Sequence, residues 1–318
     1  MTVAVLCGGV GAARFLRGVV QVVDPTTVAA IVNTADDTVM HGLSISPDLD
    51  TIVYTLAGAI DPERSWGLVD ETWQAMAALD RYTAVRPAGS SAGGSWFGLG
   101  DQDLATHLYR TARFGEGARP SDVADEVRRA WAVAVRLLPM TDEPVATMVE
   151  LASGEEVSFQ DYFVRLGHDV AVRGVRFAGA DRARPTAEVL DALETATAIA
   201  IAPSNPIVSI GPLRALRGVD DTLARRRDHV VAVSPIVGGV ALKGPADRML
   251  TELGHEASVV GVARLYTPIA TTLVIDPADA ALAPAVEAEG MRALVVPSVM
   301  KDAATAAALA EATLEAAR

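Results

Sequence analysis

The sequence predicts an α/β protein with a Rossmann-like, mostly parallel sheet, helices on both faces of that sheet, and an inserted helical cap. Short apolar runs alternate with helical patterns in the first and last parts of the chain. This alternation is typical of βαβ units, in which helices join parallel strands. The middle of the chain instead carries helical segments that begin with polar residues. We therefore expect one core built from both ends of the chain, with the middle inserted into it.

The strand predictions rest on compact apolar runs. The first run, VAVLC at residues 3–7, is followed at once by glycines and then by a helical pattern over residues 12–22. Further strands are expected at residues 28–33, 198–202, 230–234, 272–276 and 293–297. Further helices are expected at residues 186–195, 245–253 and 303–317.

The middle of the chain differs in pattern. Helices with polar first residues are expected at residues 48–56, 70–79, 101–113 and 121–131. At two of these starts, Asp70-Glu71 and Ser121-Asp122 supply acceptors where the N–H groups of a first turn point outward. We interpret residues 1–318 as a single catalytic domain, whose core comes from residues 1–56 and 136–318 and whose helical cap is residues 57–135.

Two shorter features complete the middle of the chain. A β-hairpin is expected from residues 145–151 and 156–159, with Ser153-Gly154 between them. The low-complexity stretch AGSSAGGS at residues 88–95 predicts a mobile loop.

Composition excludes several classes of protein. The chain of 318 residues has a formal net charge of −13, which argues against binding nucleic acid or an anionic membrane, since phosphate-rich partners need clustered cations. No apolar run is long enough to predict a membrane span. One cysteine excludes a disulfide scaffold and a cysteine-based metal site within one chain, and fits a reducing, cytoplasmic compartment.

The first candidate site is the glycine-rich turn Gly8-Gly9-Val10-Gly11, between a strand and a helix. Glycine permits close backbone approach, and the start of the helix offers N–H groups and a positive dipole end to a phosphate. The turn matches neither G-x-G-x-x-G, because Arg14 stands at the third glycine, nor a Walker A loop, because no lysine follows. A simple strand–helix turn is the alternative, in which Arg14 is an ordinary surface residue.

The second candidate is acidic and follows the second strand. Asp36, Asp37, Asp48 and Asp50 come just after Asn33, and in an open α/β sheet ligands bind at the carboxyl ends of strands. Carboxylate oxygens suit Mg²⁺. We favour Asp36 and Asp50 as metal ligands and Asp37 as a base or a support for those ligands. We favour Asp48 as the cap of its own helix; the alternative for Asp36 and Asp37 is that they face solvent.

Two later loops repeat the arrangement of a strand followed by a turn. Ser204-Asn205 lies between two prolines after a strand and offers hydroxyl, amide and backbone donors, although a structural turn explains it nearly as well. Ser234 and Gly238 belong to a Gly/Pro loop that continues to Lys243, one of only two lysines. Cys7 is expected to be a small core residue.

A series of motifs from residue 1 to beyond residue 250 carries a family resemblance. They are LCGGVGAARFLRG, VNTADDTVMHGLSISPDLDTIVYTLAG, DETW, WFGLGDQDLATH, LLPMTDEPVAT, FQDYFVR, APSNPIVSIGPL, VAVSPIVGG and KGPADRML. In this order they resemble the 2-phospho-L-lactate transferase family, CofD, called FbiA in mycobacteria. The whole series is far more specific than any one motif.

The resemblance implies a transferase of coenzyme F420 biosynthesis. Such enzymes join the deazaflavin Fo to a phospholactyl or phosphoenolpyruvyl group carried on guanosine diphosphate, and release GMP. It implies Mg²⁺ as cofactor, attack by the terminal ribityl hydroxyl of Fo on phosphorus, a Rossmann-like fold and a homodimer. No residue distinguishes phospholactate, phosphoenolpyruvate and phosphoglycerate as the transferred acid.

The resemblance also implies roles for particular residues. The catalytic residues are Asp36, Asp37 and Asp50, of which Asp36 and Asp50 hold the metal. The nucleotide and its phosphates contact Gly8, Gly9, Val10, Gly11, Arg14, Asn33, Ser204, Asn205, Ser234 and Gly238. The Fo ring contacts Asp50, Trp96, Phe97 and Gly98.

The chain departs from the family near the Fo site. Many relatives have a basic residue at the position of Gly98, so that contact must come from elsewhere, for which Arg81 and Arg86 are candidates. The stretch at residues 88–95 looks longer than usual and suggests a lid.

Two other functions are weighed against the transferase. A CofD-like regulator would bind a nucleotide or nucleotide-sugar without turnover; WFGLGD and PDLDT favour the enzyme, since the resemblance puts Fo and metal there. An NAD-dependent oxidoreductase predicts an acidic residue at the end of the second strand, where this chain has Asn33.

Overall fold

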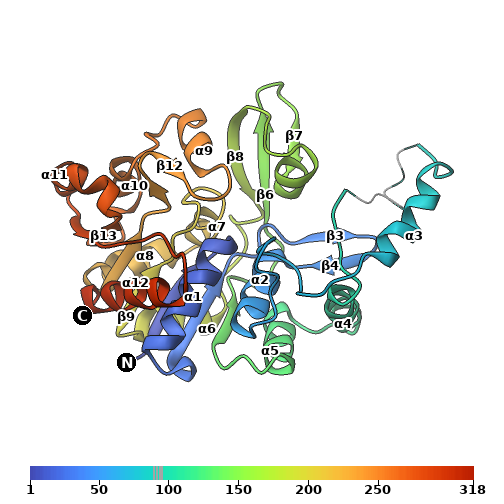
Figure 1. The fold of residues 1–318 in the computed structure, drawn as a ribbon, viewed down its shortest axis with the longest axis horizontal. Coiled ribbons are helices and arrows are strands. Elements are labelled where there is room, and N and C mark those ends of the chain that lie inside the picture. Colours follow the sequence, from blue (N-terminus) through green and yellow to red (C-terminus); the bar gives the residue numbers. More distant parts are fainter. Residues whose placement is uncertain (89, 91, 93–95) are drawn as a thin grey trace.

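A computed structural model describes residues 1–88, 90, 92 and 96–318. Seven strands of this part of the chain form a central sheet in which every neighbouring pair is parallel (Figure 1). Along the sheet the strands are β14 (Arg292–Val295), β13 (Thr272–Ile275), β10 (Val230–Val233), β9 (Ala198–Ile201), β1 (Val3–Cys7), β2 (Val28–Val32) and β5 (Arg136–Pro139). The predicted fold class is confirmed. The strand β5, which the sequence pattern did not single out, is a short edge strand that pairs with β2.

The strand order places a switch point beside β1. From β1 the chain winds toward β2 and β5 on one side, and toward β9, β10, β13 and β14 on the other. In open α/β sheets, ligands bind outside the carboxyl ends of the strands where the winding direction reverses. The loops after β1 and β9 therefore border the expected binding crevice.

Helices cover both faces of the sheet because its strands are apolar on both sides. All five residues of β1 are buried; Val3, Val5 and Cys7 face one apolar layer, whereas Ala4 and Leu6 face the other. The first layer is formed with α1 (Gly9–Val22), α2 (Pro47–Leu56), α5 (Pro120–Ala130) and α12 (Ala303–Ala316). The second layer is formed with α6 (Ala187–Thr195), α7 (Gly211–Ala215), α8 (Val219–Arg225), α9 (Ala246–Glu252), α10 (Val259–Tyr266) and α11 (Ala283–Ala288).

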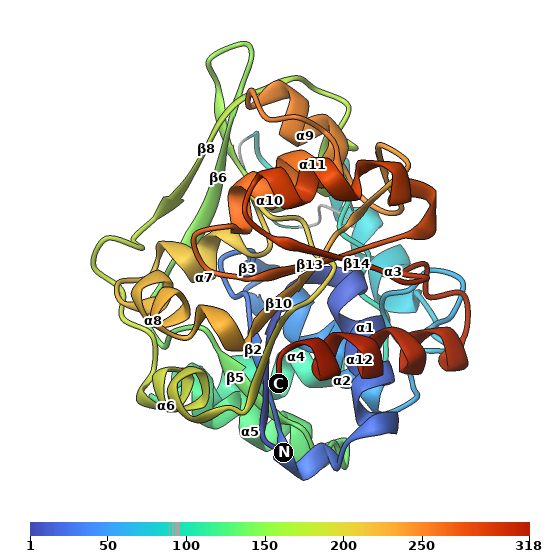
Figure 2. The same ribbon diagram turned by 90° about the vertical axis from the view of Figure 1, so that its left-hand side faces the viewer.

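The first and last helices of the chain lie side by side. Figures 1 and 2 both show α1 next to α12, near the two termini. A Cβ added to Gly18 in α1 would lie 2.2 Å from the backbone oxygen of Ala306 in α12, so only glycine permits this approach. The two ends of the sequence thus close one core, as the pattern of apolar runs predicts.

The middle of the chain supplies an arm to one side of the sheet. The antiparallel strands β3 (Thr38–Met40) and β4 (Leu43–Ile45) extend from the sheet toward α3 (Gln74–Thr83) and α4 (Asp103–Gly115) (Figure 1). The predicted hairpin is confirmed as β6 (Ala146–Leu151) and β7 (Glu156–Ser158), and β8 (Val172–Ala178) pairs with the other edge of β6.

The predicted start of a helix at Asp70 is wrong. Asp70 has a left-handed backbone, with φ of 56°, and α3 begins only at Gln74. The acceptors are exchanged between two helices: Asp101 accepts from the N–H groups of Gln74 and Ala75, whereas Glu71 accepts from those of Gln102 and Asp103 at the start of α4. Asp101 therefore caps α3, and Glu71 caps α4. Neither residue caps the helix that follows it most closely in the sequence, so the sequence pattern could not indicate these pairings.

Two further observations bear on the predictions. In the described part of the chain, no helix is both long and apolar enough to cross a membrane. The stretch at residues 88–95, predicted to be a mobile loop and lid, lies largely outside the described residues, so both ideas stay predictions.

The contact between the glycine turn and the β9 loop yields a stability prediction. A Cβ on Gly11 would lie 2.2 Å from the backbone oxygen of Pro203. Gly11→Ala is expected to lower the free energy of unfolding by about 1–3 kcal/mol, measured by urea denaturation, because backbone must move to admit the methyl group. The control is Gly115→Ala at the end of α4, where the new Cβ meets nothing within 4 Å. Equal losses in the two variants would contradict this reasoning.

Candidate active site

The glycine turn after β1 packs directly on the loop after β9. Ser204 Oγ donates to the backbone oxygen of Gly8 at 2.7 Å, and a Cβ on Gly8 would lie 2.7 Å from that of Ser209. Gly8 and Gly11 are therefore glycines because Ser209 and Pro203, in the loop after β9, occupy the space of a side chain. The structure brings the predicted glycine turn and Ser204 together at the switch point.

The start of α1 is open to an anion. Its N-cap, Gly8, has no side chain to cap the first turn, and the turn itself contains no acidic residue. The N–H of Gly9 donates to Asp48 Oδ1 at 2.9 Å, and the other N–H groups of the first turn, including those of Val10 and Gly11, have no partner inside the helix. A bound phosphate would satisfy them and would lie at the positive end of the helix dipole.

The other predicted loop residues form hydrogen bonds that hold the loops after β9 and β10 in shape. Asn205 Oδ1 accepts from the N–H groups of Ile207 and Val208, at 2.9 and 3.3 Å. The hydroxyl of Ser234 is buried and bonds to both backbone groups of Ile236, and the N–H of Gly238 donates to Asp279 Oδ2 at 2.9 Å. These contacts shape the loops of the crevice; the side chains of Asn205 and Ser234 make these bonds within the protein.

Asn33 links two carboxylates at the end of β2. Its Nδ2 donates to Asp36 Oδ2 at 2.9 Å and to Asp48 Oδ2 at 3.2 Å. Since Asp48 also accepts from Gly9, one amide and two carboxylates connect the loop after β2, the start of α2 and the start of α1. The expectation that Asp48 caps its own helix is wrong, because it accepts from α1 and α2 has no side-chain cap among the described residues.

Asp36 is a buried carboxylate of this cluster. It is 6% exposed, so the alternative that it faces solvent is wrong, and burial together with the charge of Asp48 raises its pKa well above the usual range. Thr147 lies close enough to oppose that rise, yet in the described residues neither its Oγ1 nor Asp36 Oδ1 makes a hydrogen bond of standard geometry. Burial also raises the pKa of Asp48, to about 6. A cation at these oxygens would reverse both shifts.

Asp37 lies beside the cluster and is exposed. Ser46 Oγ, at the start of α2, donates to Asp37 Oδ2 at 2.7 Å and orients it. Desolvation raises the pKa of Asp37, against the effects of the Ser46 hydrogen bond and the Arg110 charge. The geometry suits a proton acceptor at the edge of the site.

Asp50 is held by a buried arginine that the sequence analysis missed. Arg110 of α4 donates from Nη1 to Asp50 Oδ2 at 3.0 Å and from Nη2 to Asp50 Oδ1, so that both carboxylate oxygens are engaged. Asp50 is 5% exposed and Arg110 3% exposed. A paired arrangement of this kind fixes the carboxylate in position and leaves it less available to a metal than Asp36.

Further buried polar residues support Arg110 from α4 and α2. Arg110 Nη1 lies 3.2 Å from His107 Nδ1, His107 Nε2 lies 3.0 Å from Asp103 Oδ2, and Tyr54 donates to Asp103 Oδ1 at 2.6 Å. Although burial acts to raise it, the pKa of Asp103 is lowered, chiefly by the hydrogen bond and charge of His107. The signal in the sequence was the spacing, since residues 103, 107 and 110 share one face of a helix, as do residues 50 and 54.

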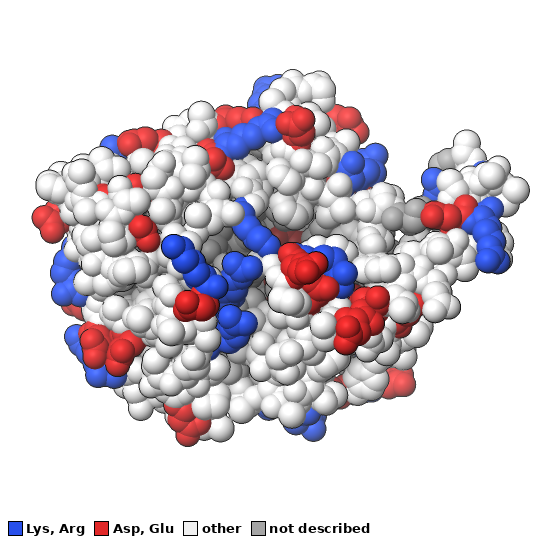
Figure 3. Space-filling view, in the orientation of Figure 1, with Lys and Arg blue, Asp and Glu red and all other residues white. Residues whose placement is uncertain are grey.

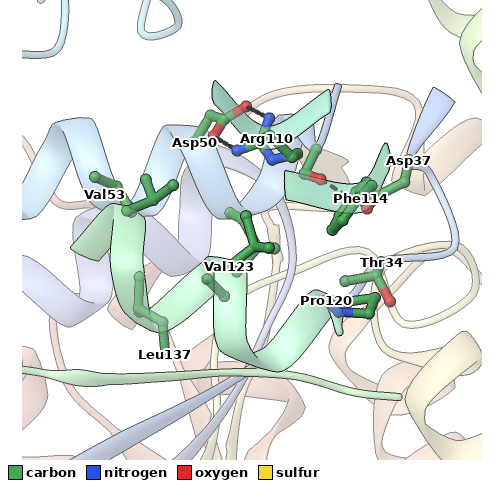
Figure 4. Close-up of a pocket in the computed structure, with 13 residues that line it drawn as sticks. Thr34, Asp37, Asp50, Val53, Arg110, Phe114, Pro120, Val123 and Leu137 are labelled. Carbon is green, nitrogen blue, oxygen red and sulfur yellow. Dashed lines mark hydrogen bonds and ion pairs between the residues drawn. The ribbon is translucent and has the colours of Figure 1, made fainter. Parts of the chain in front are cut away.

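A small pocket lies between these elements (Figure 4). Its polar end is formed by Asp37, Asp50 and Arg110, and its opposite wall is apolar, with Val53, Phe114, Val123 and Leu137. Its interior has room for little more than a water molecule. The pocket therefore marks the back of the acidic cluster and is too small to hold a tricyclic substrate.

Of the four predicted Fo residues, Asp50 lies in α2, whereas Trp96, Phe97 and Gly98 lie on the arm. Trp96 and Phe97 meet edge to face, 5.9 Å between ring centroids, and Phe97 packs on the small cluster of Ile45, Met76 and Leu99. Gly98 lies against the rings of Trp73 and Trp66, since a Cβ there would be 3.3 and 3.4 Å from them.

An arginine other than those expected lies beside the two tryptophans that pack on Gly98. The Arg64 guanidinium carbon is 5.6 and 5.3 Å from the ring centroids of Trp66 and Trp73. Arg86 instead donates to the backbone oxygens of Ser90 and Ala92 in its own loop. Arg64 is therefore the cation that the structure provides beside the aromatic surface, which the sequence analysis missed.

A comparison with protein-family models decides the family. The model described as 2-phospho-L-lactate transferase CofD matches residues 3–296. The chain belongs to the CofD family. The motifs of the CofD resemblance span this same range, including the glycine turn, the acidic cluster and the segment at Gly98.

Curated proteins of similar sequence agree with the CofD assignment. A phosphoenolpyruvate transferase of Streptomyces griseus is 40% identical over 319 residues, covering 99% of this chain and 98% of its own. Proteins of the same name from Kitasatospora aureofaciens and Mycobacterium avium are 40% and 38% identical, again over 99% of this chain, covering 97% and 98% of theirs. A solved structure of protein BH3568 from Bacillus halodurans matches with a TM-score of 0.62 at 15% identity, covering 98% of this chain and 99% of that one, which supports the CofD fold alone.

The buried ion pair gives a stability prediction. Arg110→Met is expected to lower the free energy of unfolding by about 3–5 kcal/mol in urea, because Asp50 stays buried without its partner. The control Arg113→Met, on the same helix but in ion pairs with Glu116 and Glu126 that are partly open to water, is expected to cost about 0–1 kcal/mol. The double variant Arg110→Met with Asp50→Leu should recover part of the loss; no recovery would contradict the unpaired-charge explanation.

The buried carboxylates predict a dependence of stability on pH. The pKa values of Asp36 and Asp48 are raised in the folded state, so the folded protein retains protons that the unfolded chain releases above about pH 4. Without divalent ions, the free energy of unfolding should fall as pH rises from about 4 through 6 and beyond. Asp36→Asn should flatten this fall, measured by urea denaturation at several pH values. Asp103→Asn is the contrasting control, since the pKa of Asp103 is lowered and its contribution is lost as pH falls; an unchanged slope in Asp36→Asn would contradict the assignment.

Proposed function

We propose that this protein transfers a phospholactyl-type group from a guanosine diphosphate carrier to the ribityl hydroxyl of Fo, giving F420-0 or dehydro-F420-0 and GMP. The observation that carries the proposal is the match to the CofD family over residues 3–296, together with relatives about 40% identical over nearly the whole chain. Because those relatives are named phosphoenolpyruvate transferases, we propose the enolpyruvyl form of the donor.

The switch point supports the binding of the donor diphosphate. The open start of α1 offers backbone N–H groups, and Gly8 and Gly11 let the loop after β9 pack closely against it. Transfers at phosphorus depend mainly on positioning and on the neutralisation of phosphoryl oxygens. Such a site suits an acidic protein because backbone dipoles supply a local positive field whatever the net charge.

We propose Mg²⁺ as the cofactor, with Asp36 and Asp48 as its protein ligands. The residues fit, since Asp36 Oδ1 is a buried carboxylate oxygen without a hydrogen bond of standard geometry, and Asn33 holds Asp48 beside it. No three candidate ligand side chains converge in the described part of the chain, so substrate oxygens and water would complete the set, as is usual for Mg²⁺. When bound, the ion would neutralise charge on phosphoryl oxygens.

Asp37 and Asp50 have separate roles in this proposal. Asp37 accepts the proton of the attacking ribityl hydroxyl, the new P–O bond forms to that oxygen, and the bond from phosphorus to GMP breaks in line. Ser46 keeps Asp37 oriented. Asp50, buried and held by Arg110, fixes the polar wall beside Asp37 in this proposal. We also propose a homodimer that works in the cytoplasm, with residues 57–135 as the cap over the core.

The test is an in vitro assay with Fo, Mg²⁺ and guanosine diphosphate carriers of phosphoenolpyruvate or phospholactate. A deazaflavin product and GMP are expected. Asp37→Asn should lower kcat by about 10²–10⁴-fold with little change in KM, as for loss of a general base. The control Asp122→Asn, an exposed residue paired with Arg119, should retain activity. No product from the wild-type protein with any donor would overturn the proposal.

A further inference from the structure

Two cations converge on one hydroxyl oxygen beside the glycine turn. Arg14 Nη2 donates to Ser65 Oγ at 3.0 Å, and Lys243 Nζ donates to the same oxygen at 2.8 Å. The three residues come from α1, from the loop before α3 and from the loop after β12 (Val240–Ala241). Tertiary structure therefore assembles this cluster from distant parts of the sequence.

The two cations lack acidic partners. Within the described residues neither Arg14 nor Lys243 forms an ion pair, although the chain contains 40 acidic side chains. Two like charges on one neutral oxygen repel each other, and the pKa of Lys243 is lowered by desolvation and by Arg14. An anion between them would remove that repulsion. Figure 3 shows Lys and Arg side chains gathered beside a hollow near the middle of this face.

Ser65 is held in an unusual conformation. Its φ is 64°, in the left-handed region that non-glycine residues rarely adopt, and it is 6% exposed. Its N–H donates to the backbone oxygen of Asp61 at 2.8 Å, which fixes the turn. The hydroxyl thereby stands where an oxygen of an anionic ligand would accept the same two hydrogen bonds.

The position of this cluster indicates which end of the donor it contacts. On one side, Arg14 is in α1, whose first turn borders the switch point and suits the diphosphate. On the other side, Ser65 is followed directly by Trp66, which packs on Trp73 and Gly98. The cluster therefore lies between the expected sites of the nucleotide and of the acceptor. In a transferase of this kind, that is where the transferred acid lies.

We propose that Arg14 and Lys243 form a two-cation site, organised by Ser65, that binds the carboxylate of the acid carried by the guanosine diphosphate donor. The inference rests on the proposed function for the identity of this donor. It makes Lys243 a specificity residue that selects donors whose transferred group bears a carboxylate. Ser65 holds the two cations together until that carboxylate replaces its hydroxyl.

The test compares the only two lysines of the chain. Lys243→Met is expected to raise KM for the phosphoenolpyruvate-bearing guanosine diphosphate donor by about 10-fold or more, because one charge-assisted hydrogen bond is lost. KM for Fo and the Kd for GDP, measured by calorimetry, should stay within about twofold. The control Lys301→Met removes an exposed lysine and should leave all three values unchanged. Lys243→Arg, which keeps the charge, should recover part of the donor affinity.

Three outcomes bear on the two proposals separately. Unchanged donor KM in Lys243→Met overturns the two-cation site. Equal weakening of GDP and donor also overturns it, since the cations would then hold the nucleotide diphosphate. If the wild-type protein shows no turnover, calorimetry with phosphoenolpyruvate in the presence of GMP still tests the site: binding that Lys243→Met abolishes and Lys301→Met does not would support it, although the transferase proposal would fail.

Discussion

The packing of the glycine turn on the loop after β9 is the constraint on which the site depends. At Gly8 and Gly11, Ser209 and Pro203 of the other loop fill the space of a side chain, and Ser204 bonds to Gly8. This contact brings the carboxyl ends of β1 and β9 together at the switch point and sets where α1 begins. From that start follow the open first turn, the hydrogen bond from Gly9 to Asp48, and the place of Arg14 one turn later.

The charged side chains at the surface and the buried carboxylates of this protein have different surroundings. The net charge of −13 belongs to the surface as a whole, whereas the interior holds a linked set of acids whose environments differ. Asp50 is paired with Arg110 through both carboxylate oxygens, whereas no described arginine or lysine pairs with Asp36, and burial raises the pKa of Asp36 well above its usual range. Two carboxylates close together in the sequence therefore have different surroundings, because α4 presents an arginine to Asp50 and none to Asp36.

The predictable parts of the structure are those that depend on local pattern. Continuous apolar runs identified the parallel strands. Helices cover both faces of such a sheet, so side chains on both sides of each strand are apolar. Where the outcome depended on a neighbour in space, local reasoning failed. Asp101 and Glu71 cap each other's helices, and Asp48 accepts from α1, although each is placed in the sequence as a cap for the helix that follows it. The turn at residues 61–68 brings Arg64 to Trp66 and Trp73, a contact that the order of residues in the chain does not indicate.

The sequence by itself determined the fold class, the glycine turn and the acidic loop, since these follow from periodicity and from residues adjacent in the chain. The tertiary structure alone decided which side chains are partners: Arg110 with Asp50, Asn33 between Asp36 and Asp48, and Lys243 beside Arg14. The reason is physical. A hydrogen bond or ion pair depends on distances of about 3 Å, and residues 50 and 110, or 14 and 243, reach that distance only after the sheet and its helices have packed.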